Sequence, residues 1–167
     1  LGSSITIPYF YSISNSRDLT FRPRFYLDND YILQSEYREA FQKSNLIADF
    51  SFNRKENTST HFFAELNGTL SDDSSYEIQV QNVTNDNYLK IHNFKSISDT
   101  NSLMANIDPS TLSSFLTINN QIDDDTSFSS TVTMYEDLTV SNDNDKYQYI
   151  FPEFNFSKSI DLDESYD

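Results

Sequence analysis

Apolar and polar residues alternate along most of this chain, most clearly near its N-terminal end. Between residues 19 and 27 the odd positions are Leu, Phe, Pro, Phe and Leu, whereas the even positions are Thr, Arg, Arg and Tyr. A period of two places these two sets on opposite faces of an extended strand. The pattern therefore predicts a strand with one apolar, aromatic face and one face that carries guanidinium groups.

The same alternation predicts further strands, separated by clusters of Asn, Asp and Ser that are typical of turns. Several of these segments run for about ten residues, which exceeds the usual strand length and matches what a tilted strand needs to cross a bilayer. The predicted strands are 4–14, 18–27, 31–41, 45–53, 60–70, 75–84, 112–122, 127–138 and 147–158.

Residues 85–111 interrupt this pattern and are expected to form one long loop. The loop contains two weakly helical pieces, 87–94 and 101–107, and Pro109 closes the second. Strands that follow one another without intervening helices are antiparallel neighbours. The expected fold is all-β, an antiparallel meander of long strands, either a partial segment of a transmembrane β-barrel or a soluble sandwich. Strand length, the aromatic apolar face and the lack of periodic turn glycines favour the barrel.

Composition narrows the choice of partners. The 167 residues suffice for one domain, and the formal net charge of −15 argues against nucleic acid, which needs a basic face. All five arginines lie within residues 1–54, where six basic and six acidic side chains balance. Cysteine is absent, which excludes disulfides and thiolate metal sites within this chain. We expect the chain to be an excerpt from a longer protein.

No catalytic, cofactor or metal motif is present in the sequence. His61 and His92 have no metal-ligand partner at helical spacing, and no nucleophile or phosphate-binding signature lies near them. The triplet Asp123-Asp124-Asp125 lacks the spacing of a calcium loop and is expected to be a solvated turn. We therefore expect no catalytic residues, no cofactor and no metal site.

Three segments resemble the outer-membrane LPS-assembly protein family, known as LptD or organic solvent tolerance protein. They are PYFYSIS (residues 8–14), RDLTFRPRFY (17–26) and LQSEYR (33–38), in the last of which Ser35 replaces the family's usual glycine. The later stretches THFFAELNGTLSDDSSYEIQVQNVTNDNYLKIHNF and YIFPEFNF are similar to the family in rhythm and order.

This resemblance implies that residues 1–167 form the first part of a large outer-membrane barrel in a Gram-negative cell. Family members carry an N-terminal periplasmic jellyroll and enclose a plug lipoprotein. They pass lipopolysaccharide from a periplasmic bridge into the outer leaflet. The implied partners are therefore lipopolysaccharide, the plug lipoprotein, the periplasmic bridge and the outer membrane. A general porin and a secreted β-sandwich binding module remain as alternatives.

The resemblance also suggests roles for two groups of residues. Pro8 and Pro23 are nearly equidistant from the turn at Asn15-Ser16, and proline cannot donate to a strand ladder. We expect them to be the hinge of a lateral gate through which lipid enters the membrane. A second group is expected on the lumen face as candidate lipopolysaccharide contacts or as salt bridges: Arg22, Arg24, Gln34, Glu36 and Arg38.

Loop lengths place 85–111 outside the cell and the Asn15-Ser16 turn in the periplasm.

Overall fold

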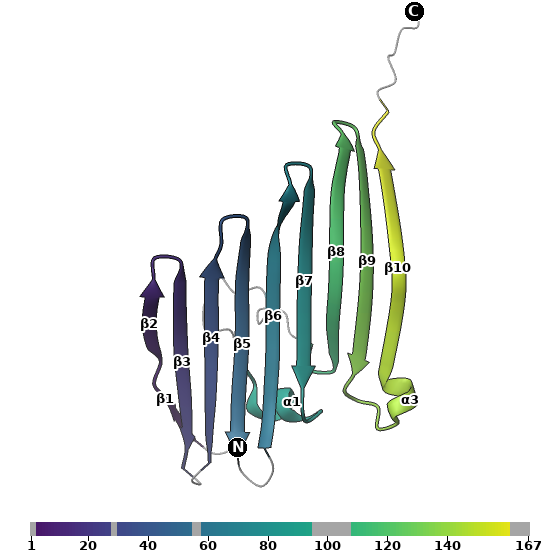
Figure 1. Ribbon diagram of the computed structural model, residues 1–167. Helices are drawn as coiled ribbons and strands as arrows, with labels where there is room; N and C mark the ends of the chain where they lie inside the picture. Colours follow the sequence, from purple (N-terminus) through teal and green to yellow (C-terminus); the bar gives the residue numbers. More distant parts are fainter. Residues whose placement is uncertain (1–2, 28–29, 55–57, 95–107, 161–167) are drawn as a thin grey trace, which may run out of the picture.

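The computed structural model describes residues 3–27, 30–54, 58–94 and 108–160. Ten strands in this part of the chain form one antiparallel sheet (Figure 1). The strands are β1 (Ser4–Thr6), β2 (Tyr9–Ser14), β3 (Arg17–Tyr26), β4 (Tyr31–Ala40), β5 (Ser44–Arg54), β6 (Thr58–Ser71), β7 (Ser74–Val83), β8 (Thr111–Asp123), β9 (Thr126–Asp137) and β10 (Tyr147–Lys158). Two short helices, α1 (Tyr88–His92) and α3 (Asp143–Lys146), lie in the connections. The predicted strands are confirmed to within two residues at each end, except that 4–14 is divided at Ile7-Pro8.

The sheet is a simple meander, as the sequence predicts. From β3 to β10 each strand pairs with the next in sequence, and β1 and β2 both pair with β3. The described sheet is open, with β1 and β2 along one edge and β10 along the other. Figure 1 shows that successive hairpins are displaced in the same direction along the strands, so the sheet is sheared.

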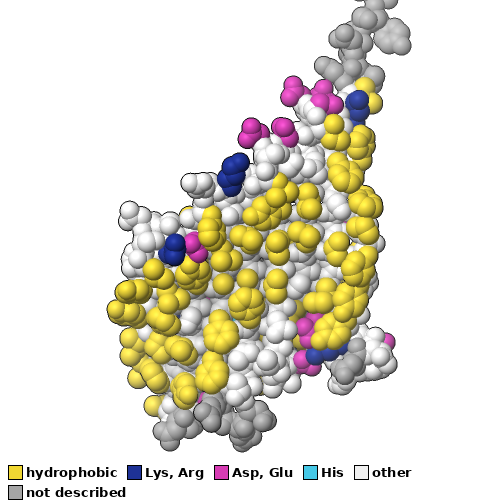
Figure 2. Space-filling view, viewed as in Figure 1, with side chains coloured by type: hydrophobic (Ala, Val, Ile, Leu, Met, Phe, Trp, Pro, Cys, Tyr) yellow, Lys and Arg dark blue, Asp and Glu magenta, His cyan; other side chains and the backbone are white. Residues whose placement is uncertain are grey.

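The strand register keeps two faces separate across the sheet. One face brings together apolar cross-strand pairs such as Phe50 with Phe62 and Leu116 with Val132. The opposite face carries polar residues, among them Arg22, which pairs with Gln34. The alternation predicted from sequence is therefore confirmed. We call these the apolar face and the polar face; hydrophobic side chains cover the face shown in Figure 2.

The two ends of the sheet differ in their connections. Tight turns at residues 15–16, 41–43, 72–73 and 124–125 lie at one end (Figure 1). The opposite end carries α1 and α3 in the connections that follow β7 and β9. The described parts of the predicted loop, residues 85–94 and 108–111, thus lie at the end of the sheet opposite the Asn15-Ser16 turn.

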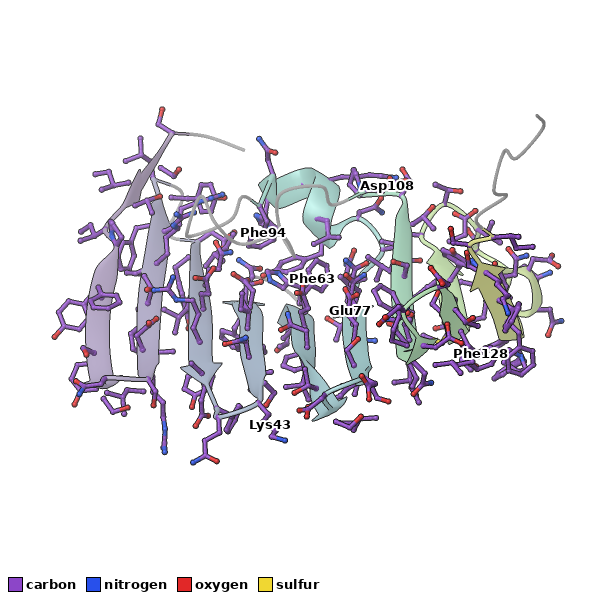
Figure 3. All side chains as sticks on the ribbon, turned by 90° about the horizontal axis from the view of Figure 1, so that it is seen from above. Lys43, Phe63, Glu77, Phe94, Asp108 and Phe128 are labelled. Carbon is purple, nitrogen blue, oxygen red and sulfur yellow. The ribbon has the colours of Figure 1, made fainter. Side chains whose placement is uncertain are left out.

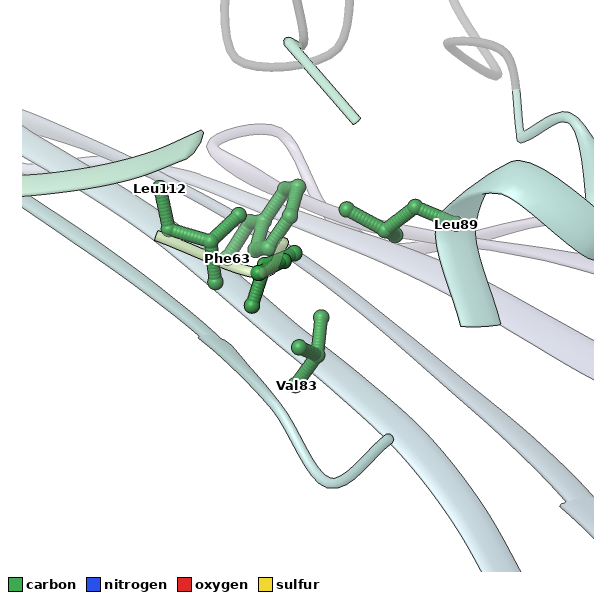
Figure 4. Close-up of a cluster of buried hydrophobic side chains, with 5 residues drawn as sticks. Phe63, Val83, Leu89 and Leu112 are labelled. Carbon is green, nitrogen blue, oxygen red and sulfur yellow. The ribbon is translucent and has the colours of Figure 1, made fainter. Parts of the chain in front are cut away.

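Helix α1 accounts for the first helical piece expected in the loop, whereas residues 101–107 lie outside the described residues. A helix of five residues is too short to be stable alone, so tertiary contacts must hold it. Asn93 ends it in the left-handed region, with φ of 45°, and its N–H donates to the Leu89 carbonyl. Leu89 packs into a buried cluster where β7 and β8 separate (Figure 4), together with Phe63, Val83, Leu112 and Leu138.

The distribution of buried residues is the reverse of that in a water-soluble domain. Among the described residues, twelve polar or charged residues are buried but only eight hydrophobic ones. Large hydrophobic side chains are instead exposed at 26 described positions, including Phe50, Phe62 and Leu116 on the apolar face. Soluble proteins bury their large apolar residues and seldom bury charged ones.

Candidate functional site

The candidate site lies on the polar face of β3–β6, under α1. Viewed along the strands, α1 lies on one side of the sheet, and Phe63 and Phe94 lie between that helix and the strands (Figure 3). Phe94 also packs edge-on against the ring of His61, with ring centroids 4.7 Å apart. Aromatic packing of this kind adds to the contacts that hold the α1 segment on the polar face.

A chain of hydrogen bonds runs from α1 into the sheet. The Tyr88 hydroxyl lies 2.9 Å from Ser51 Oγ, which in turn lies 2.7 Å from His61 Nδ1. His61 Nε2 is 2.6 Å from Asp49 Oδ1, and Gln34 Nε2 donates to both oxygens of that carboxylate at 3.1 Å. Asp49, Ser51 and His61 are completely buried. Every member of this network therefore depends on its neighbours for hydrogen bonds.

The direction of donation follows from the chemistry of the groups. Burial raises the pKa of Tyr88 to about 12, so its phenol stays protonated and can donate to Ser51. An ionised Asp49 carboxylate only accepts, so His61 Nε2 carries a proton. A neutral His61 ring then accepts from Ser51 through Nδ1. We call this the Tyr88–Ser51–His61–Asp49 network.

Its inner three members have the connectivity of a Ser-His-Asp relay, in which a histidine links a hydroxyl to a carboxylate. Tyr88 contacts Ser51 Oγ, and Ser51 is fully buried. No substrate carbonyl can reach that oxygen while α1 is in place. In this conformation the arrangement attaches α1 to the sheet rather than performing acyl transfer.

His61 and His92, which have no partner at helical spacing in the sequence, both acquire partners in the folded chain. The β5–β6 register places His61 directly opposite Ser51. Asp49 precedes Ser51 by two residues on β5, so its side chain lies on the same face. The carbonyl of His92 accepts a hydrogen bond from Arg24 Nη1 at 2.7 Å, and its Nδ1 is 3.4 Å from the Tyr26 hydroxyl. The sequence does contain a signal for the His61 partners. Residues two apart on a strand share a face, and pairing across the β5–β6 hairpin brings residues 51 and 61 together.

The predicted lumen residues do lie on one face, but most are already engaged. Arg38 Nε donates to Asp18 Oδ1 at 2.8 Å and is 3.8 Å from Glu36 Oε1, one of the ion pairs expected for this residue. Gln34 and Glu36 are almost completely buried. Arg24 is held by the His92 carbonyl, and Arg22 lies beside it, opposite Gln34. Contact of these residues with lipopolysaccharide stays a prediction.

The two prolines lie one residue apart in cross-strand register. The β1–β3 and β2–β3 pairings share one register, which places Ile7 opposite Pro23 and Pro8 opposite Arg22. Ile7 N donates to the Pro23 carbonyl at 3.1 Å, but Pro23 has no N–H to return that bond. Because antiparallel residues alternate between inward and outward hydrogen bonding, the nitrogen of Pro8 points to the free edge. Pro23 therefore weakens the ladder inside the sheet, whereas Pro8 removes a donor from its edge.

The remaining candidates are accounted for by local structure. Arg17 Nε pairs with Glu39 Oε1 at 2.9 Å beside the Asn15-Ser16 turn. In the acidic turn, Asp125 N donates to Asp123 Oδ1 at 3.0 Å. Within the described ranges, no three His, Asp or Glu side chains come close enough to hold a metal ion.

None of the protein-family models searched matches the chain, and no curated protein matches it at a significant level. In the part of the chain that the structure describes, no helix is both long and apolar enough to span a membrane.

Proposed function

We propose that this chain is part of an outer-membrane barrel that delivers lipopolysaccharide to the outer leaflet. The observation that carries the membrane part of the proposal is the inverted distribution of buried and exposed residues. An apolar sheet face that is exposed over successive strands, opposite a buried polar face, suits a sheet between acyl chains and an aqueous lumen.

Strand dimensions support the same proposal. The strands β3–β10 contain 10 to 14 residues each. About 9 to 11 tilted residues cross the hydrocarbon core of a bilayer. The uniform displacement of successive hairpins in Figure 1 is the stagger that a closing barrel requires. Closure itself is part of the proposal, with further strands joining the β1–β2 edge and the β10 edge.

The substrate is proposed from the resemblance in the first 41 residues. Lipopolysaccharide combines acyl chains with phosphates and sugars, so its carrier needs an apolar exit beside a polar interior. The polar face carries Arg22 and Arg24, and guanidinium groups form strong hydrogen bonds with phosphate. Because Pro23 has no N–H, one ladder hydrogen bond is missing and the pairing of the first strands is weaker. This supports a lateral gate at Pro8 and Pro23.

Two features of the chain indicate opposite orientations of the proposed barrel in the membrane. Loop length places the α1 end outside the cell. However, β1 starts at that same end, and a periplasmic jellyroll preceding β1, as the resemblance implies, would place it in the periplasm. We favour the second orientation, because a chain that enters the barrel directly from a periplasmic domain must start there. Labelling of the single-cysteine variants Asn15→Cys and Asn142→Cys in intact cells tests this orientation. An impermeant thiol reagent should then label the Asn15 end and not the Asn142 end.

Membrane embedding is tested with adjacent tryptophans on opposite faces. The chain contains no tryptophan. We expect Leu116→Trp in liposomes to be quenched by brominated acyl chains, and Phe115→Trp, on the polar face, to be quenched by acrylamide instead. Equal quenching of both variants by acrylamide, or folding of the protein without detergent or lipid, would reject the proposal.

Lipopolysaccharide delivery is tested with Pro8→Ala and Pro23→Ala in the full-length protein. We expect the double variant to lower the rate at which newly made lipopolysaccharide reaches the cell surface, because Pro23→Ala restores a ladder bond to Ile7. Co-purification of a lipoprotein separates this transporter from a porin. Unchanged delivery, with unchanged amide exchange at Ile7, would contradict the gate but not membrane embedding.

A further inference from the structure

We propose that α1 is a displaceable lid, whose opening frees Arg24 and the row of polar groups beneath it for an anionic, hydroxyl-bearing ligand. The identification of this ligand as the phosphorylated sugar of lipopolysaccharide depends on the proposed function. The lid itself depends only on the contacts of α1.

The lid has little stability of its own. It spans five residues, and Asn87, the N-cap residue that precedes it, makes no side-chain capping bond. One apolar side chain, Leu89, joins the cluster around Phe63. Its other described contacts are polar or aromatic, and they attach its two ends to different strands. Three of its five residues, Tyr88, Leu89 and His92, are buried, so its position depends on these tertiary contacts. An element that is not stable without such contacts can open locally while the rest of a protein stays folded.

The C-terminal end of α1 is hydrogen-bonded to a cationic side chain, Arg24. Arg24 Nη1 donates to the His92 carbonyl at 2.7 Å, which is a short charge-assisted bond. The carbonyl oxygen stands where an oxygen of a phosphate or carboxylate ligand would bind. A formally charged oxygen attracts the guanidinium more strongly than a carbonyl does, so such an anion can compete with the lid.

The N-terminal end of α1 occupies a hydroxyl-binding position. Tyr88 contacts Ser51 at 2.9 Å, and Ser51 continues into His61 and Asp49. When α1 departs, Ser51 loses this partner, and a ligand hydroxyl can replace it. Anion recognition at Arg24 together with hydroxyl recognition at Ser51 selects a phosphorylated or carboxylated sugar.

The test measures how often the lid opens. The chain has no cysteine, so Ser51→Cys reports opening through its rate of modification by a charged methanethiosulfonate reagent. Ser129→Cys, on the polar face of β9 and away from α1, is the matched control. In the full-length protein in detergent, we expect Ser51→Cys to react at least tenfold more slowly than Ser129→Cys. Adding Leu89→Ala should raise the Ser51→Cys rate at least tenfold and leave the control unchanged.

Inorganic phosphate then tests the ligand class. At constant ionic strength, phosphate should raise the Ser51→Cys rate to a plateau. Arg24→Gln should raise the rate without phosphate and abolish the response to it. Equal rates for the two cysteines, or no effect of Leu89→Ala, would overturn the lid; a phosphate response that survives Arg24→Gln would overturn the anion site. None of these readouts needs a membrane, so a lid that passes while Leu116→Trp fails to contact lipid would refute only the proposed function.

Discussion

Placing a charge at the centre of the apolar face measures the environment of that face directly. Leu116 lies in the middle of β8 between Ile78 and Val132, and its side chain is 41% exposed. If lipid covers this face, Leu116→Arg should destabilise the folded protein by about 2–4 kcal/mol, the cost of a lipid-facing Arg at mid-depth. That corresponds to a roughly 30- to 1,000-fold shift toward the unfolded state.

The assay is urea-dependent folding of the full-length protein into phosphatidylcholine vesicles, followed by electrophoretic mobility. Thr117→Arg is the neighbouring control on the polar face, where a cation can stay hydrated. Leu70→Arg is the depth control, since Leu70 lies one residue from the end of β6 on the apolar face, and we expect a cost of about 0–1 kcal/mol. If Leu116→Arg costs no more than the two controls, this face does not contact hydrocarbon and the proposed topology is wrong.

Three further predictions concern the polar network, the connections and the sheet. His61→Ala should lower the free energy of unfolding by about 1–3 kcal/mol, because it removes one hydrogen-bond donor from the buried Asp49 carboxylate and leaves the donation from Gln34; an equilibrium urea titration measures this, and a loss below about 0.5 kcal/mol would show that water replaces the lost bond. Lys146 bonds to Asp86 at 2.9 Å, and this raises the pKa of its amine. The ion pair should therefore stabilise the fold fully below the ordinary lysine value of about 10.4 and lose this effect as pH rises through the raised pKa; Lys146→Met should remove that alkaline part of the thermal-stability profile, and an unchanged profile would contradict it. Gly68→Ala should destabilise the sheet by about 1–3 kcal/mol in the same titration, since a Cβ there would lie 2.6 Å from the Lys43 carbonyl oxygen, and a neutral result would mean that the 41–43 turn adjusts freely.

The strands and their faces could be predicted from sequence because both depend on neighbouring residues. Alternation from Leu19 to Leu27 fixes which side chains share a face, and turn clusters fix where the strands end. Even the division of the first strand is explained by local chemistry, since Pro8 follows Ile7 and Pro23 lies opposite that residue. Period-two patterns are robust because shifting a strand by one residue would reverse its faces.

The candidate site could not be predicted because it depends on register and on the course of a loop. Ser51 and His61 are ten residues apart and meet only through β5–β6 pairing. Tyr88 lies 37 residues beyond Ser51 and reaches it only because the chain turns back over the polar face after β7. No spacing rule for helices or metal sites covers such distances, so the histidines looked isolated.

The two unusual features of this sheet have a common explanation. Figure 3 shows α1 on the polar side, α3 lies at the end of β9 and β10 in Figure 1, and all ten described strands lie in one sheet. A cover for Phe50, Phe62 and Leu116 must therefore come from outside the described residues. A second protein layer would account for that face but not for charged residues buried on the other. The topology that we propose, with acyl chains on one side and a lumen filled by polar loops, water and partner protein on the other, would account for both, because each face would then meet a medium of its own polarity.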